Sequence, residues 1–262
     1  MVVQHNLSAM NTNRQMGVVT SALQKSTEKL SSGYKINRAG DDAAGLSISE
    51  KMRSQIRGLN KASDNAQDGI SLIQVAEGAL NETHSILQRM NELATQAAND
   101  TNTSVDRQSI KDEIEQLNKE LDRISTTTQF NKQDLLTGGF SGKLQVGALK
   151  GQTMDVKISL AVSAKGLKVS AVEVSTNVKA GVAMHSIQDA IESVSKQRSK
   201  LGAIQNRLEH TINNLDTNAE NTQAAESRIR DTDMADEMVQ YSKNNILSQA
   251  GQSMLAQANQ QT

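Results

Sequence analysis

Residues 73–97 read IQVAEGALNETHSILQRMNELATQA, and this stretch decides the class of fold. Its less polar residues are separated by gaps that alternate between three and four, the spacing of one face of an α-helix. They are Ile73, Ala76, Leu80, Thr83, Leu87, Met90, Ala94 and Ala97. We expect the helix to begin at Asp41 or Asp42, either of which can cap it, and to end near Asn99. At about 1.5 Å per residue it would be roughly 85 Å long, which predicts a rod.

Two other stretches have the same period. A polar turn at 99–104 leads into a helix that fades at 126–128 and carries Ile110, Ile114, Leu117, Leu121 and Ile124. So short a turn implies an antiparallel helical hairpin. From about Met184 the period returns at Ile187, Ile191, Val194, Leu201, Leu208, Ile212 and Leu215, with Arg198 and Gln205 in two apolar slots. The three stretches together predict a long antiparallel helical rod bundle.

Both ends of the chain are typical of weak helices. Val2, Ala9, Met16, Leu23 and Leu30 recur every seven residues and form a thin stripe, and Leu247, Ala250, Met254 and Ala258 form a second one. Residues 1–40 hold five basic residues and one acidic residue, a charge of 5 − 1 = +4. Residues 231–262 hold one basic and four acidic residues, a charge of 1 − 4 = −3. We therefore expect the two ends to pair as a terminal coiled coil, because neither stripe can stabilise a lone helix.

Between the second and third long helices the period changes to two. Leu144 and Val146 alternate with polar residues, as do Val156, Ile158, Leu160 and Val162, while Lys150-Gly151 and Lys165-Gly166 resemble turns. We expect two or more small β-hairpins here. The predicted fold is mainly α and has three parts. Residues 1–40 and 231–262 form the terminal coiled coil, residues 41–137 and 182–230 the helical rod, and residues 138–181 the β-hairpin region.

The composition excludes several classes of protein. Aromatic residues make up 2% of the chain, and proline and cysteine are absent, so the strongest helix breaker is missing. We find no run of 18 apolar residues and no signal-peptide pattern at the start, so neither a membrane span nor a cleaved signal is expected. With a net charge of −1, nucleic acid and membrane are not expected as partners.

Catalysis, metal binding and cofactor binding are not expected either. The four histidines, at positions 5, 84, 185 and 210, are scattered, and no His-Glu-x-x-His motif occurs. No cysteine can act as a ligand or nucleophile, and the glycines form no phosphate-binding loop. A catalytic function requires a set of converging groups, so the sequence predicts that the protein is not an enzyme.

The predicted monomer has too little apolar core for its length. Its thin seams need further apolar contacts, which neighbouring copies can supply. A head-to-tail contact that does not close as a ring generates a helical filament. We place the subunit interface on the terminal helices, at Leu23, Leu30, Val239, Ile246, Leu247 and Met254.

Several motifs resemble those of bacterial flagellins. The N-terminal half contains LSSGYKINRAGDDAAG at 30–45, NAQDGI at 65–70, EGALNE at 77–82 and TQFN at 128–131. The C-terminal half contains LGAIQNRL at 201–208, SRI at 227–229, QAG at 249–251 and LAQANQ at 255–260. The motifs occur in the family's order, and the resemblance covers nearly the whole chain except roughly 138–182.

The resemblance implies a structural subunit of the bacterial flagellar filament, located outside the cell. Subunits of this family leave the cell through the flagellar type III export apparatus and bind a chaperone. They fold beneath the filament cap, adjoin the hook-junction proteins and form a helical homopolymer for motility. Many relatives carry large variable outer domains, whose place is taken here by residues 138–181. The resemblance therefore implies a short form without outer domains.

The resemblance also implies recognition by the animal Toll-like receptor 5. The family's contact motif corresponds to LQRMNELA at residues 87–94. It places the receptor-binding residues at Gln88, Arg89 and Leu93 on the first rod helix and at Glu113 on the second. From the spacing alone, Leu93 would be a bundle residue and Arg89 a solvated charge.

Other functions share the same helical plan. The main alternative is a hook–filament junction protein or another coiled-coil subunit of a secretion system. A soluble coiled-coil signalling protein or adhesin would instead form a closed oligomer. Electron microscopy discriminates between them, because a filament subunit should extend seeds into long tubes and a junction protein should not.

Overall fold

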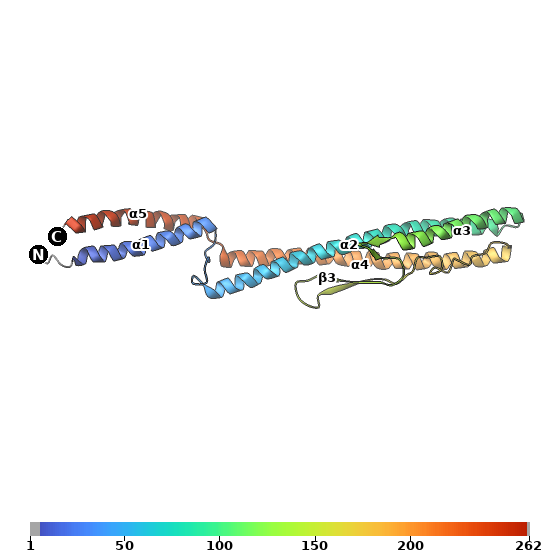
Figure 1. Cartoon of the computed structure of the whole chain (residues 1–262), viewed down its shortest axis with the longest axis horizontal. Coiled ribbons are helices and arrows are strands. Elements are labelled where there is room, and N and C mark those ends of the chain that lie inside the picture. The colour runs from blue at the N-terminus through green and yellow to red at the C-terminus, as the bar shows by residue number, and fades with distance from the viewer. Residues whose placement is uncertain (1–5, 261–262) are drawn as a thin grey trace. The chain divides into compact units, whose positions relative to one another are not determined.

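The computed structural model describes residues 6–260 and is mainly α-helical, as the sequence predicts (Figure 1). The elements in chain order are α1 (Leu7–Ser32), α2 (Ala43–Ala97), α3 (Ser104–Thr127), β1 (Gln129–Phe130), β2 (Gln133–Asp134), β3 (Phe140–Gln145), β4 (Thr153–Ile158), α4 (Asn177–Arg230) and α5 (Met234–Gln260). They form two compact units. The terminal unit combines the chain up to residue 57 with the chain from residue 219, and the central unit contains residues 58–218.

The core of the central unit is built from the stripes of α2, α3 and α4. All eight residues of the α2 stripe are buried, which confirms the spacing argument. Ile110, Ile114, Leu121 and Ile124 of α3 and Ile187, Val194, Leu201 and Leu208 of α4 are buried with them in one apolar cluster. Thr103 caps α3 in a box with Asp106, in which each side chain accepts a hydrogen bond from the other residue's backbone N–H.

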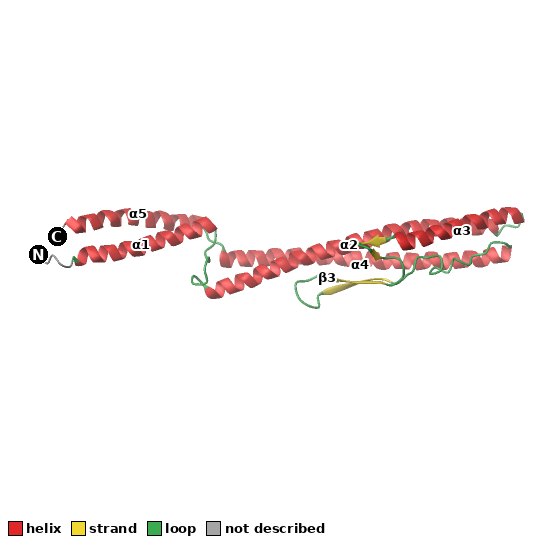
Figure 2. Ribbon diagram, viewed as in Figure 1, coloured by secondary structure: helices red, strands yellow, loops and turns green. Residues whose placement is uncertain are grey.

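Two small antiparallel strand pairs follow α3 (Figure 2). In the larger pair, β3 and β4 align Phe140 with Ile158 and Gln145 with Thr153. Met154, Val156 and Ile158 are buried and alternate with exposed residues, so the predicted period of two is confirmed for this strand. The turn at Lys150-Gly151 connects these strands, and Gly151 has a φ of 90°, which glycine adopts without strain.

The expectation of a second hairpin around Lys165-Gly166 is wrong. β4 ends at Ile158, and residues 163–172 form a series of turns on the surface of α3. Two polar side chains of α3 hold this segment, because Asp122 accepts a hydrogen bond from the N–H of Ala164 and Asn118 donates one to the carbonyl of Val169. The second strand pair is β1–β2 instead, immediately after α3.

Two details of α4 also differ from the sequence analysis. The helix begins at Asn177 rather than near Met184, because the hydroxyl of Thr176 caps it by accepting a hydrogen bond from the N–H of Lys179. The polar side chain that is buried in this part of α4 is that of Gln197, not that of Arg198. The Gln197 amide donates to the carbonyl of Lys157 on β4, at 3.4 Å, while Arg198 pairs with Glu77 near the surface.

The terminal unit contains the antiparallel pair of α1 and α5 (Figure 1). Gly33 ends α1 in the left-handed conformation with a φ of 75°. Asp233 caps α5, accepting hydrogen bonds from the N–H groups of Ala235 and Asp236, and Asp42 caps α2 through the N–H of Gly45. The predicted aspartate cap of α2 is thus confirmed, and Asp42 rather than Asp41 supplies it.

Candidate subunit interface

Three contacts define how α1 and α5 run against each other. The amide of Asn6 donates to the carbonyl of Ala258 at 2.9 Å. Met16 lies beside Gly251, 3.9 Å from the position that a Cβ would occupy there. Lys29 forms an ion pair of 3.3 Å with Glu237. As the number rises along α1 it falls along α5, so these contacts fix one antiparallel register.

The seam between the two helices is poor in apolar side chains. Among the described residues of α1 and α5, only Ser26 and Glu237 are buried, and both are polar. Eight residues of α5 lose part of their exposure. Asn245 lies beside the other seven, which recur with gaps of four and three: Glu237, Tyr241, Asn244, Ser248, Gly251, Leu255 and Ala258. Such a seam holds the pair weakly, because apolar burial supplies most helical stability in proteins.

This seam corrects the one that we expected on α5. Of Leu247, Ala250, Met254 and Ala258, only Ala258 lies on the side of α1, and the other three are exposed. The sequence analysis followed the larger apolar side chains, whereas most of the α5 residues that face α1 are small or polar, with Leu255 as the large aliphatic residue among them. The signal that was missed is the seven-residue repeat of Glu237, Asn244, Gly251 and Ala258.

The large apolar residues of α5 form an outward stripe, which we define as Val239, Ile246, Leu247, Ala250 and Met254. Their spacing of seven, one, three and four places them on one side of the helix, away from the seam. Val239 is 69% exposed, Ile246 66% and Met254 61%. A continuous apolar stripe on the surface of a helix marks a site of interaction with another protein.

Helix α1 has a similar outward face. Leu7, Met10 and Val18 are exposed, and they lie on the opposite side from the seam residues. Ala9, Met16, Leu23 and Leu30, which the sequence analysis grouped into one stripe, are all half-buried in the seam, while Val2 lies outside the described residues. Of the predicted interface residues, Leu23 and Leu30 therefore lie inside the pair, and Val239, Ile246, Leu247 and Met254 lie on its surface.

Polar contacts around Arg230 brace the connections to the terminal helices. The Arg230 guanidinium donates to Glu50 at 2.8 Å and lies over the ring of Tyr34, 4.8 Å from its centroid. The carbonyl of Arg230 accepts a hydrogen bond from the N–H of Lys35. The Arg230 guanidinium also holds the pKa of the Glu50 carboxyl below its ordinary value of 4.5. Sequence reasoning missed this cluster, because its members are far apart in the chain.

The candidate receptor residues lie on α2 and α3 of the central unit. Arg89 is exposed and bridges the helices, donating to Glu113 on α3 at 3.0 Å and to Glu92 on its own helix at 3.1 Å. The Glu113 carboxylate, followed by Glu92, raises the pKa of Arg89, so the guanidinium is permanently charged. Gln88 is exposed beside His84, at 3.0 Å. Leu93, by contrast, is 2% exposed and belongs to the core.

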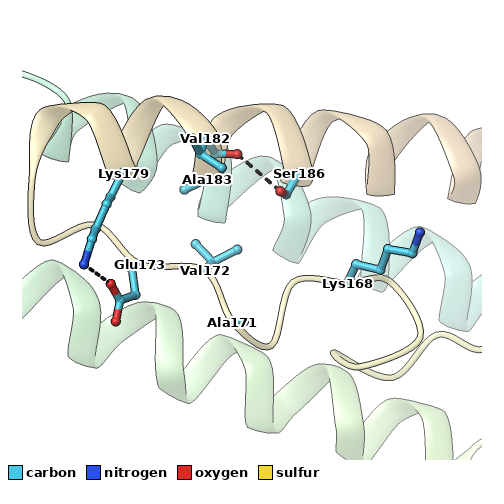
Figure 3. A pocket seen from close by; sticks show the side chains of 8 residues that line it. All are labelled: Lys168, Ala171, Val172, Glu173, Lys179, Val182, Ala183 and Ser186. Atoms are coloured by element: carbon cyan, nitrogen blue, oxygen red, sulfur yellow. Dashed lines mark hydrogen bonds and ion pairs between the residues drawn. The ribbon is translucent and has the colours of Figure 1, made fainter.

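One open groove of about 340 Å³ lies where the loop before α4 meets the start of that helix (Figure 3). Its apolar lining includes Val172, Val182 and Ala183, and an ion pair between Lys179 and Glu173 lies at one end. Lys179 lowers the pKa of Glu173, so the carboxylate is charged near neutral pH. Ser186, whose hydroxyl lines the groove, donates a hydrogen bond to the carbonyl of Val182 on its own helix.

No helix within residues 6–260 combines the length and hydropathy needed to cross a membrane. Within the same residues, no cluster of three or more His, Cys, Asp or Glu side chains is placed to hold a metal ion.

Two family models match the chain. The bacterial flagellin N-terminal helical region matches residues 3–141, and the bacterial flagellin C-terminal helical region matches residues 184–262. The chain is 56% identical to a flagellin of Halalkalibacterium halodurans, over all of this chain and 97% of that protein. It is 51% identical to a flagellin of Bacillus subtilis, with the same coverage, and 50% identical to the flagellar filament 31.3 kDa core protein of Treponema maltophilum, over 99% and 96%.

Solved structures give a consistent picture. The crystal structure of Bacillus cereus flagellin is 33% identical, with a TM-score of 0.53, and the match covers 62% of this chain and 94% of that one. A putative flagellar hook-associated protein from Vibrio parahaemolyticus has a TM-score of 0.64 at 14% identity, covering 73% and 100%. The second likeness shows a shared fold alone.

Proposed function

The chain belongs to the bacterial flagellin family, and from this premise we propose that its copies assemble through the outward faces of α1 and α5. Flagellins are structural subunits of the extracellular flagellar filament, and the protein is not an enzyme. We also propose that residues 1–40 and 231–262 form the coiled-coil domain of the subunit, and that residues 41–137 and 182–230 form its rod domain, with the β-hairpin region at 138–181.

The observation that carries this proposal is the arrangement of side chains on α5. Its large apolar residues Val239, Ile246 and Met254 face outward, while most of the α5 residues that face α1 are small or polar. A helix pair that stands alone in water would gain stability from the opposite arrangement. Burying the stripe against another copy would remove this apolar surface from water, at about 25 cal/mol per Å².

Two substitutions test this interface. Leu247→Asp and Met254→Asp place a charge in the outward stripe, where assembly would have to desolvate it. We expect both variants to stop extending filament seeds in electron micrographs while their central units unfold at the wild-type temperature. Gln252→Asp, an exposed position of α5 outside the stripe, is the matched control and should extend seeds normally. Normal growth of both stripe variants would remove the interface from these residues.

The same premise supports proposals about export and partners. We propose that the chain leaves the cell through the flagellar type III export apparatus, binds a chaperone before export, and adds to the filament beneath its cap, next to the hook-junction proteins. Membership of the family supports each step. Cells that lack the export apparatus should retain the protein inside, and its appearance outside such cells would contradict the route.

We propose, in addition, that Toll-like receptor 5 recognises the surface around Arg89. Support comes from the family motif and from the exposure of Arg89, Gln88 and Glu113 on neighbouring helices. Because Leu93 is buried, we expect it to contribute to receptor binding indirectly, by holding α2 in place. Leu93→Ala should lower the free energy of unfolding by about 2–5 kcal/mol.

The receptor proposal is tested by affinity measurements on the monomer. Arg89→Ala should weaken receptor binding without lowering the unfolding temperature by more than a few degrees, because surface ion pairs contribute only about 0–1 kcal/mol. Arg123→Ala, which also removes an exposed arginine from an ion pair, should bind as the wild type does. Unchanged affinity in both Arg89→Ala and Leu93→Ala would remove the assignment.

A hook–filament junction protein remains the second candidate. The likeness to the Vibrio hook-associated protein favours it only at the level of the fold, whereas the sequence matches favour a flagellin. Growth of seeds into long tubes would decide for the filament subunit, and capping of seeds without growth would decide for the junction protein.

A further inference from the structure

We propose that the ion pair between Lys29 and Glu237 sets the register of α1 against α5 and so positions the subunit interface. The two residues act as positioning residues, because they lie in the seam and not on the outward faces. This inference rests on the proposed function, in which those outward faces meet another copy of the chain.

Glu237 has an unusual environment for an acidic residue. Among the described residues it is the one charged residue that is buried, and its side chain is 11% exposed. Ser26 is buried in the same part of the seam. The Lys29 ammonium, 3.3 Å away, is the charged partner of the carboxylate. Burying a carboxylate without such a partner costs free energy. The pair of helices therefore favours the register that places the Lys29 ammonium beside Glu237.

The rest of the seam selects register poorly. A slide of α5 by seven residues, about 10.5 Å, would put Asn244 or Ala258 where Gly251 now lies beside Met16. A Cβ at position 251 would make only an ordinary van der Waals contact with Met16, so this position does not require glycine. At the far end, Asn6 donates to a backbone carbonyl, which every residue of α5 possesses. Glu237 would be left without its charged partner after the slide.

The ion pair also continues a connection at the base of the two helices. The N–H of Thr232 donates to the carbonyl of Gly33 at 3.0 Å, just outside both helices. Lys29 lies four residues from Gly33 and Glu237 lies five residues from Thr232, about one helical turn beyond this bond in each helix. The ion pair therefore extends the register of this connection into α1 and α5.

Register matters because the proposed interface has two halves. The outward stripe belongs to α5, and the exposed Leu7, Met10 and Val18 belong to α1. A neighbouring copy can bury both at once only if they lie at a fixed distance along the pair. Buried polar pairs set register in this way in coiled coils, at some cost in stability.

The test compares three full-length proteins in seeded assembly. Lys29→Leu with Glu237→Leu replaces the pair by apolar side chains, so α1 and α5 should stay paired at least as well. Lys29→Glu with Glu237→Lys reverses the pair and keeps it. We expect the wild type and the reversed variant to extend seeds at similar rates, and the double-leucine variant to extend them at least tenfold more slowly, on the reasoning that wrong registers dominate.

A cross-link reads the register directly, because the chain contains no cysteine. Cysteines at Met16 and Gly251 report the native register, and cysteines at Met16 and Ala258 report a slide of seven residues. In the wild-type background only the first pair should cross-link, and in the double-leucine background both should. Wild-type growth of the double-leucine variant with only the native cross-link, or failure of the reversed variant to grow, would overturn the inference. Failure of the wild type itself to extend seeds would overturn the proposed function instead.

Discussion

Arg230 shows how much a single residue contributes to the terminal unit. Its guanidinium is largely buried, and it connects the end of α4 to Glu50 on α2 and to Tyr34 in the segment after α1. Its carbonyl accepts a hydrogen bond from Lys35 in the same segment. The side chain thus holds three stretches of chain together through charge and ring contacts. Lysine could not replace Arg230, because its compact ammonium group lacks the planar guanidinium that contacts the Glu50 carboxylate and the Tyr34 ring at once.

The Glu50–Arg230 contact predicts a pH dependence of stability. Because the folded state lowers the pKa of Glu50 below 4.5, the contact contributes fully above that pH and is lost as the pH falls through the folded value. We expect urea unfolding of the wild type to show a steeper loss of stability between about pH 5 and about pH 3 than unfolding of Glu50→Gln. Identical pH profiles for the two proteins would show that the contact does not stabilise the fold.

At the scale of elements, glycines mark where another element approaches α2. A Cβ at Gly69 would clash with Leu144 on β3, whereas a Cβ at Gly78 would meet open space. Gly69 thus lets the β-hairpin lie close to the helix, and Gly78 is an exposed position in the helix interior. Two glycines of one helix consequently have different roles, which the sequence alone does not distinguish.

These two glycines give a matched pair of substitutions. Gly78→Ala should raise the free energy of unfolding by about 0.5–1 kcal/mol, because alanine is the better helix former. Gly69→Ala should show less of this gain or a net loss, since Leu144 must move away from the new methyl group. Urea titrations of both variants measure the difference, and equal gains would contradict the close approach of the hairpin.

At the scale of the whole molecule, the two units differ in what stabilises them. The central unit buries a continuous apolar cluster drawn from α2, α3, α4 and the hairpin. In the terminal unit, the α1–α5 pair buries only Ser26 and Glu237 among its described residues. We therefore expect the terminal helices to be the least stable part of the monomer and to gain their order in the filament.

Limited proteolysis tests this difference. In the monomer, a nonspecific protease should first remove the segments 6–40 and 231–260 and leave a fragment that contains the central unit. In assembled filaments the same segments should resist cleavage, because the interface covers them. Equal protection of the ends in monomer and filament would contradict the dependence of the terminal pair on assembly.

The sequence by itself determined most of the helical fold. Alternating gaps of three and four located the buried faces of α2, α3 and α4, and the absence of proline allowed α2 to continue for 55 residues. Asp42, one of the two aspartates predicted to cap α2, does cap it, because capping depends on neighbouring residues along the chain. The flagellin motifs indicated the family before any coordinates.

Only the tertiary structure decided which face of α5 lies inside. Gly251 and Ser248 face α1, and Ile246 and Met254 face away, although apolarity alone suggests the reverse. The same holds for Gln197, whose buried amide depends on a carbonyl of β4, and for Lys29 and Glu237, which are 208 residues apart. Periodicity records how one helix is patterned, but the identity of the partner that covers a face is a property of segments distant in sequence.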